Sequence, residues 1–99
     1  MSEFKFLVSS SFMHKKLVEL GAGYMLPDSF IDVTVEENGI MTLGQSVKIN
    51  IEFRPKGNRK FQIKSESFSS FAKVVRQISD QPITVGFDDN RIELLYAMF

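Results

Sequence analysis

The side chains best placed to do chemistry in this 99-residue sequence are the basic residues of two segments that have the hydrophobic pattern of helices. They are Lys15 and Lys16 in the first segment, residues 12–20, and Lys73 and Arg76 in the second, residues 68–78. Cations on adjacent helices attract a polyanion through solvent without reading the identity of its bases. These four residues could therefore contact nucleic-acid phosphates nonspecifically. Alternatively, they form the solvated face of two surface helices.

A second set of cations surrounds a predicted turn at residues 54–60. This turn contains two arginines and two lysines, and Lys64 follows closely. It could touch phosphates or an acidic partner, although lysines also gather at hairpin tips because they keep the tip solvated. The segment contains glycine and lysine but lacks the spacing and the trailing Ser or Thr of a phosphate-binding loop. We therefore expect a solvated turn here.

The other residues with catalytic or metal-binding potential do not converge. His14 is the only histidine and the chain has no cysteine, so a metal site would need carboxylates alone. The serines at residues 9–11 lie close to His14, but helix capping explains them more simply than nucleophilic catalysis. Paired acids at residues 36–37 and 88–89 fall at predicted turns, and adjacent strand residues face opposite ways. We expect no catalytic residues, no metal and no cofactor, and therefore a protein that is not an enzyme.

The composition is that of an ordinary globular domain. Hydrophobic residues make up 43% and charged residues 24%, and 12 basic against 12 acidic side chains give a net charge of zero. The whole chain therefore has no strong attraction for nucleic acid, and charge has to be judged face by face. No segment approaches the ~18 apolar residues of a membrane helix, and no signal peptide opens the chain. Without cysteines for a disulfide framework, we expect one domain over residues 1–99, located in the cytoplasm and without a membrane partner.

Two amphipathic helices and a set of strands must hold the cations in place. In the second helix, Ser67 is the expected N-cap, and apolar residues at helical spacing follow it. These are Phe68, Phe71, Ala72, Val75 and Ile78, and the polar residues Ser69, Ser70, Lys73, Arg76 and Gln77 fall on the opposite arc. The first helix has Met13, Leu17 and Leu20 on one side, and the glycines of residues 21–23 end it. Hydrophobic runs and alternation predict strands at residues 3–8, 30–35, 40–43, 47–53, 61–63, 83–87 and 92–96.

The order of these elements is similar in the two halves of the chain. Both helices open on Ser-Ser-Phe, at residues 10–12 and 69–71, and the hairpin turns at residues 36–40 and 88–92 both combine acids with Asn. An internal duplication would give pseudo-twofold symmetry, whereas two similar amphipathic units could also have converged. We predict an α+β fold with two helices packed side by side on one face of a largely antiparallel sheet. The methionines and phenylalanines are expected in its core.

This arrangement resembles one domain of the DNA sliding clamps, the bacterial polymerase processivity-ring family. The most similar stretch runs from Gln62 to Leu94, where a short strand enters a helix that ends in a basic residue and two strands follow around an acidic turn. The opening strand at residues 4–8 and the hairpin at residues 33–43 also fit, so the resemblance covers most of the chain. It depends on the order of the elements, because sliding clamps have no catalytic signature. Clamp chains contain more than one such domain, so a ring built from this chain would be a homo-oligomer.

The resemblance implies a non-enzymatic module of DNA replication, a processivity factor or a relative of one. In sliding clamps the basic side chains of the helices face duplex DNA, and by position this role passes to Lys15, Lys16, Lys73 and Arg76. The implied partners are duplex DNA, further copies of the chain, and another clamp or replication protein. A different class of function is a protein-interaction or regulatory module that uses exposed sheet edges and binds no DNA. The zero net charge and the single-domain length favour this second class.

Overall fold

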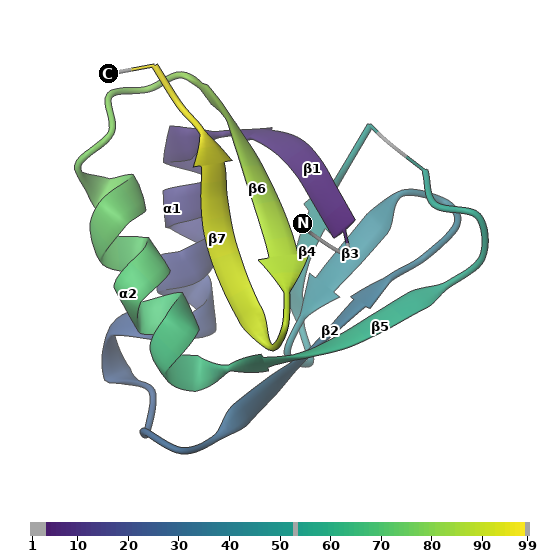
Figure 1. Cartoon of the computed structure of the whole chain (residues 1–99), viewed down its shortest axis with the longest axis horizontal. Coiled ribbons are helices and arrows are strands. Elements are labelled where there is room, and N and C mark those ends of the chain that lie inside the picture. The colour runs from purple at the N-terminus through teal and green to yellow at the C-terminus, as the bar shows by residue number, and fades with distance from the viewer. Residues whose placement is uncertain (1–3, 53, 99) are drawn as a thin grey trace.

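A computed structural model describes residues 4–52 and 54–98, and these residues form the α+β fold that the sequence predicts. Two helices lie side by side and pack against antiparallel sheets (Figure 1). In chain order the elements are β1 (Phe4–Ser9), α1 (Ser10–Leu20), the short 3₁₀ helix η1 (Ala22–Tyr24), β2 (Phe30–Val35), β3 (Ile40–Leu43), β4 (Val47–Asn50), β5 (Arg59–Lys64), α2 (Ser65–Arg76), β6 (Pro82–Asp88) and β7 (Arg91–Tyr96). Glu3 and Phe53, which the sequence places in strands, lie outside the described residues.

The strands form two sheets where the sequence predicts one. A three-stranded sheet has the order β1-β6-β7, and a four-stranded sheet has the order β4-β3-β2-β5. β1 leads into α1 but pairs with β6, and β5 leads into α2 but pairs with β2. Each hairpin therefore takes its extra strand from the other half of the chain, and this exchange closes two sheets instead of one.

The exchange follows a pseudo-twofold pattern. The unit β1–α1 aligns without a gap on the unit β5–α2, and in each unit the strand pairs with the first strand of the hairpin that follows the other helix. In this alignment Phe6 corresponds to Phe61, and Ser10 corresponds to Ser65; all four are buried. The predicted Ser-Ser-Phe equivalence, which matches Ser10 with Ser69, is therefore displaced by about one helical turn.

The first residue of α1 is a buried serine that holds the two halves together. Ser10 Oγ donates to the carbonyl of Ser79 (2.9 Å) and accepts the backbone N–H of Gln81 (3.1 Å). The backbone N–H of Ser10 also donates to the carbonyl of Gln81 (2.8 Å). One polar side chain thus fixes the start of α1 to the connection between α2 and β6.

Ser65, the first residue of α2, is buried in the same way and bonds to the connection between η1 and β2. Its Oγ donates to the carbonyl of Leu26 (2.7 Å) and accepts a hydrogen bond from Ser29 Oγ (2.8 Å). Its backbone N–H donates to the carbonyl of Ser29 (2.9 Å). Burying a hydroxyl group is costly unless it is hydrogen-bonded. These hydrogen bonds therefore explain why both serines can be buried.

The start of α2 corrects the prediction that Ser67 is its N-cap. The helix begins two residues earlier, at Ser65, and Lys64 occupies the N-cap position without a side-chain hydrogen bond. The carbonyl of Ser29 takes the place of a cap by accepting the N–H of Ser65. Ser67 instead accepts the backbone N–H of Ile92 on β7 (2.9 Å). In contrast, α1 has a side-chain cap from Ser9, one of the three serines considered for that role.

The two hairpin turns use different residues. In the β2–β3 turn Gly39 has a φ of 87°, whereas in the β6–β7 turn Asp89 and Asn90 have φ values of 48° and 65°. Positive φ at both central residues gives a two-residue turn whose twist matches that of the strands. The carbonyl of Gly39 also accepts the N–H of Ile51 (2.8 Å), just beyond the end of β4, which stops at Asn50 instead of continuing to residue 53.

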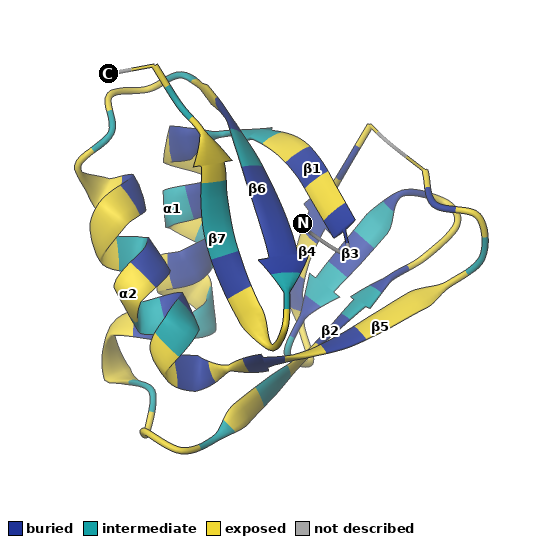
Figure 2. Ribbon diagram, in the orientation of Figure 1, coloured by how far each residue is buried: buried dark blue, intermediate teal, exposed yellow. Residues whose placement is uncertain are grey.

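One hydrophobic core joins the helices to both sheets (Figure 2). At its centre the ring of Phe87 lies between Phe6 and Phe61, with centroid distances of 5.7 and 5.4 Å. The predicted inner face of α2 contributes Phe68 and Phe71, which are both buried. These side chains bring residues of both halves into one interior, so neither sheet has a core of its own.

Some of the residues expected in the core are exposed. Phe12 is 39% exposed and Phe30 is 53% exposed. Met98 is 70% exposed. Phe12 projects from the polar arc of α1, Phe30 is the first residue of β2, and Met98 follows the last strand, so none of the three points between the layers.

Candidate nucleic-acid interface

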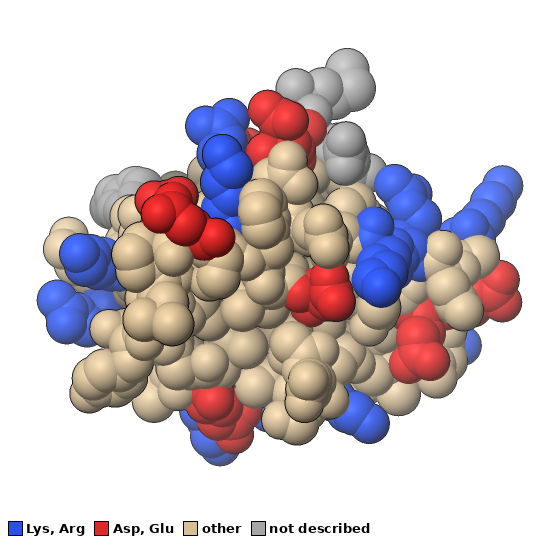
Figure 3. Space-filling model, turned by 90° about the horizontal axis from the view of Figure 1, so that it is seen from below, with Lys and Arg blue, Asp and Glu red and all other residues tan. Residues whose placement is uncertain are grey.

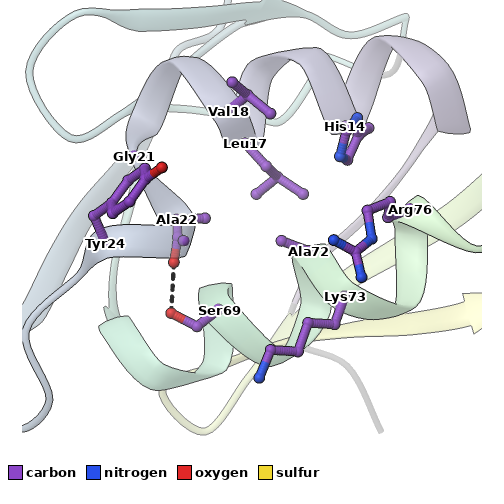
Figure 4. A pocket seen from close by; sticks show the side chains of 11 residues that line it. His14, Leu17, Val18, Gly21, Ala22, Tyr24, Ser69, Ala72, Lys73 and Arg76 are labelled. Atoms are coloured by element: carbon purple, nitrogen blue, oxygen red, sulfur yellow. Dashed lines mark hydrogen bonds between the residues drawn. The ribbon is translucent and has the colours of Figure 1, made fainter.

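A groove of about 440 Å³ separates α1 from α2 (Figure 4). Both helices and η1 line it. Besides the backbone of two glycines, the lining comprises His14, Leu17 and Val18 from α1, Ala22 and Tyr24 from η1, and Ser69, Ala72, Lys73 and Arg76 from α2. The groove therefore contains two of the four basic residues that the sequence singles out.

Small residues leave the space between the two helices unfilled along this groove. α2 presents Ser69 and Ala72 to it, and the chain leaves α1 through Gly21, whose φ of 80° allows the sharp turn into η1. Ser69 Oγ donates to the carbonyl of Ala22 (2.6 Å), which fixes η1 against α2 (Figure 4). A large side chain in place of Ser69 or Ala72 would fill the space between the helices.

The groove is positively charged although the protein is neutral. Its lining includes Lys73 and Arg76, with His14 opposite, and no carboxylate. Within residues 4–52 and 54–98, neither Lys73 nor Arg76 takes part in an ion pair. Seen from below, the molecule has basic and acidic side chains interspersed around a broad uncharged area (Figure 3). The unpaired cations of the groove are therefore a local concentration of charge.

The two basic residues predicted on α1 do not line the groove. Lys16 Nζ forms an ion pair with Glu19 (3.1 Å) and lies 5.3 Å from the ring centroid of Phe12, and its side chain is only 19% exposed. Lys15 is exposed. At about 100° per residue, the ridge of His14 and Val18 faces α2, so the two lysines that follow His14 project away from it. Of the four predicted residues, Lys73 and Arg76 thus line the groove, and Lys15 and Lys16 lie outside it.

Tyr24 is the lining residue that is hardest to select from the sequence. It closes one end of the groove, its side chain is 93% exposed, and no hydrophobic periodicity includes it. The one indication in the sequence is that Tyr24 is an aromatic residue directly after Gly-Ala-Gly. At this position no predicted helix or strand would cover its ring. His14 was considered only as a base or a ligand, and the structure instead places it on the wall of the groove.

The basic turn does not form an anion site. Its last two cations, Arg59 and Lys60, already belong to β5, and Arg59 lies 5.6 Å from the ring centroid of Phe61. The shallow depression beside it, about 210 Å³, is lined by Lys60 together with Asp88 and Asp89. Carboxylates beside the lysine would repel a phosphate there. A solvated turn, as expected from the sequence, is consistent with this geometry.

The described part of the chain shows no group of three or more His, Cys, Asp or Glu residues that could hold a metal ion. The paired acids lie at the hairpin turns where the sequence predicts them: Glu36 and Glu37 follow β2, whereas Asp88 is the last residue of β6 and Asp89 follows it. These pairs are on separate hairpins. Nothing in this arrangement places a nucleophile, a base and an oxyanion donor together.

A second surface of interest is the outer strand β7. Ser67 Oγ bonds to the backbone of Ile92 at one end of this strand, accepting its N–H and donating to its carbonyl (3.3 Å). Further along, Leu95 is 41% exposed and Tyr96 is 63% exposed. The strand has β6 on one side only. It therefore offers an edge with two large apolar side chains.

Among the described residues, no helix is both long enough and apolar enough to cross a membrane. Comparison with known proteins gives no relative for this chain: no protein-family model, no curated protein and no solved structure matches it. The resemblance to sliding clamps therefore stays a prediction from the order of the elements.

Proposed function

We propose that this protein is a non-enzymatic, nucleic-acid-associated module that contacts phosphates nonspecifically through its helix pair. The observation that carries the proposal is the groove that both Lys73 and Arg76 line, with no ion pair to another described residue and no carboxylate in the lining. An unpaired cation gives up no internal partner when it binds a phosphate. Arginine adds a planar donor fork that matches phosphate oxygens.

The number of cations limits the strength of this interaction. Lys16 is engaged with Glu19, so the available contacts are Lys73 and Arg76 in the groove, together with Lys15 for a phosphate that lies outside the groove. Each neutralised phosphate contributes about −0.9 to the slope of log K against log salt for duplex DNA. We therefore expect weak binding to one copy, with a slope of about −2 to −3. Several copies around one duplex, as in a clamp-like homo-oligomer acting in cytoplasmic DNA replication, would add their contacts.

Fluorescence anisotropy of a labelled DNA duplex at low salt tests the proposal. Lys73→Glu combined with Arg76→Glu should abolish binding, since it converts the groove from positive to negative. The matched control is Lys5→Glu with Lys48→Glu, which changes the net charge equally on exposed strand residues that do not line the groove. Absence of binding by the unchanged protein, or an equal loss in the control, would overturn the proposal.

A second candidate function is a protein-interaction module that uses the edge of β7. The observation that favours it is the outer strand with Leu95 and Tyr96 exposed on it. An edge strand of this kind is a template for pairing with another strand. In sedimentation experiments, self-association should then persist in the Lys73→Glu, Arg76→Glu variant and be lost on Tyr96→Lys. A monomer at all concentrations would contradict self-pairing.

A further inference from the structure

The groove has two chemically different ends. Tyr24 stands at one end, and His14 and Arg76 stand at the other, whereas the Lys73 side chain extends from α2 back toward Ser69 (Figure 4). α1 lines the groove from His14 to Gly21, a distance of about 10 Å at the helical rise of about 1.5 Å per residue. An aromatic ring is thus separated from a cationic group by a short apolar stretch.

The stretch between the ends is apolar and formed by small or branched side chains. Leu17 and Ala72 face each other across it, and Val18, which is 65% exposed, forms its rim. The volume of about 440 Å³ lies within the range of about 300–1,000 Å³ that is usual for small-ligand sites. A flat ring with two apolar faces would fit such a floor.

Tyr24 has no structural role that explains its exposure. Its side chain is 93% exposed at the end of η1 and adds nothing to the core. The hydrogen bond from Ser69 Oγ to the carbonyl of Ala22 (2.6 Å) holds the backbone of η1 against α2 and so places Tyr24 at the end of the groove. An exposed aromatic ring in the same groove as cations is the combination that binds single-stranded nucleic acid, in which bases stack on aromatic side chains and the backbone follows the positive charge.

We propose that the α1–α2 groove takes a single-stranded nucleic acid, with one unstacked base against Tyr24 and the apolar floor and its phosphate at Lys73 and Arg76. This inference rests on the proposed function and narrows it to a class of nucleic acid. In a duplex the bases stay stacked and paired, so a duplex can use the cations but neither the floor nor Tyr24. An acidic peptide could also contact the cations, but its carboxylate side chains offer no flat ring to the apolar floor of the groove.

The test compares a labelled oligo(dT) strand with a DNA hairpin duplex of the same number of phosphates, by anisotropy at matched low salt. The single strand should bind at least about fivefold more tightly, since base–aromatic stacking contributes roughly that factor or more per base. Tyr24→Ala should remove this advantage and leave duplex binding unchanged. Tyr24→Phe should retain it, because the ring is kept. Tyr96→Ala, which removes an exposed tyrosine from β7, is the matched control and should change neither.

A groove-filling variant provides a second, independent measurement. Ala72→Leu places a larger side chain on the floor without removing a cation, and leucine is a good helix former. It should lower affinity for oligo(dT) and leave duplex binding and the circular dichroism spectrum unchanged.

Three outcomes would overturn the inference. Equal binding of strand and duplex, unaffected by Tyr24→Ala, would refute the stacking of a base on Tyr24. The phosphate contacts of the proposed function would remain. Binding of polyglutamate as tightly as oligo(dT) would show that charge alone is recognised. Binding of neither DNA would overturn the proposed function together with the inference.

Discussion

The two halves of the molecule share an interior and differ in their surfaces. In each half a strand leads into a helix whose first residue is a buried serine, Ser10 or Ser65, bonded to a connection in the other half. On the surface, α1 engages Lys16 with Glu19, whereas α2 leaves Lys73 and Arg76 without an ion pair among the described residues. The repeated plan thus builds the scaffold, and the binding chemistry is concentrated on one of its two helices.

The largest expected effect tests whether the interiors of the two halves are equivalent. Phe6 and Phe61 occupy corresponding positions, and both rings contact Phe87. Phe6→Ala and Phe61→Ala should each lower the free energy of unfolding by about 3–5 kcal/mol, because each leaves a cavity in the core. Urea denaturation followed by circular dichroism measures this. A loss below about 1 kcal/mol for either variant would contradict the equivalence.

The hairpin turns provide the next comparison. Gly39→Ala should cost about 2 kcal/mol or more, since φ is 87° and an added Cβ would lie 2.8 Å from the carbonyl oxygen of Ile51. Asp89→Gly in the other turn should change the stability by less than about 0.5 kcal/mol, because Asp89 is exposed at a φ that glycine adopts freely. Thermal unfolding of the two variants checks the difference. Similar losses in both would show that the turns are not distinct.

The buried serines Ser10 and Ser65 are equivalent in position, but only Ser65 has a neighbouring hydroxyl that can replace its hydrogen bond. Ser10→Ala should cost about 2 kcal/mol, because it leaves the carbonyl of Ser79 without its hydroxyl donor. Ser65→Ala should cost only about 1 kcal/mol, since Ser29 Oγ lies 2.8 Å from the same Leu26 carbonyl and can donate its proton there once Ser65 Oγ is gone. Ser70→Ala on the exposed face of α2 is the control. Denaturant midpoints that rank Ser65→Ala as the more damaging variant would contradict this assignment.

The smallest effect concerns the surfaces of the helices. Lys73→Gln should reduce the magnitude of the salt slope of duplex binding by about 1, the change expected for one lost phosphate contact. Lys16→Gln should leave that slope unchanged and alter stability by less than about 0.5 kcal/mol, because an i,i+3 ion pair along one helix contributes little. Anisotropy titrations at several salt concentrations separate the two. An equal change for Lys16→Gln would place both helices in the interface.

Local structure could be predicted from the sequence more fully than the partners of each element. Alternation fixed β2 at residues 30–35 and β3 at residues 40–43 with the bounds that the structure has. Alternation tells which side of a strand is buried but not which strand lies beside it, so the exchange of β1 and β5 between the halves was not foreseen. Ser67 failed as a cap for a similar reason, because a carbonyl far away in the sequence replaces the cap.

The candidate site was predictable to the same extent. Helical periodicity correctly placed Lys73 and Arg76 on the outer arc of α2, where both are exposed. It does not say how two helices are rotated against each other, which decides that His14 and Val18 line the groove and that Lys15 does not. Tyr24 lies outside any periodic segment, so its place at the end of the groove depends on the tertiary fold alone.

The pairing of β1 with β6 also has a consequence for synthesis. A ribosome adds roughly 5–20 residues per second, so Phe4 and Phe6 wait on the order of ten seconds before residues 82–88 exist to cover them. During that interval the nascent chain carries an uncovered apolar strand, and a chaperone that shields it would govern the yield of native protein.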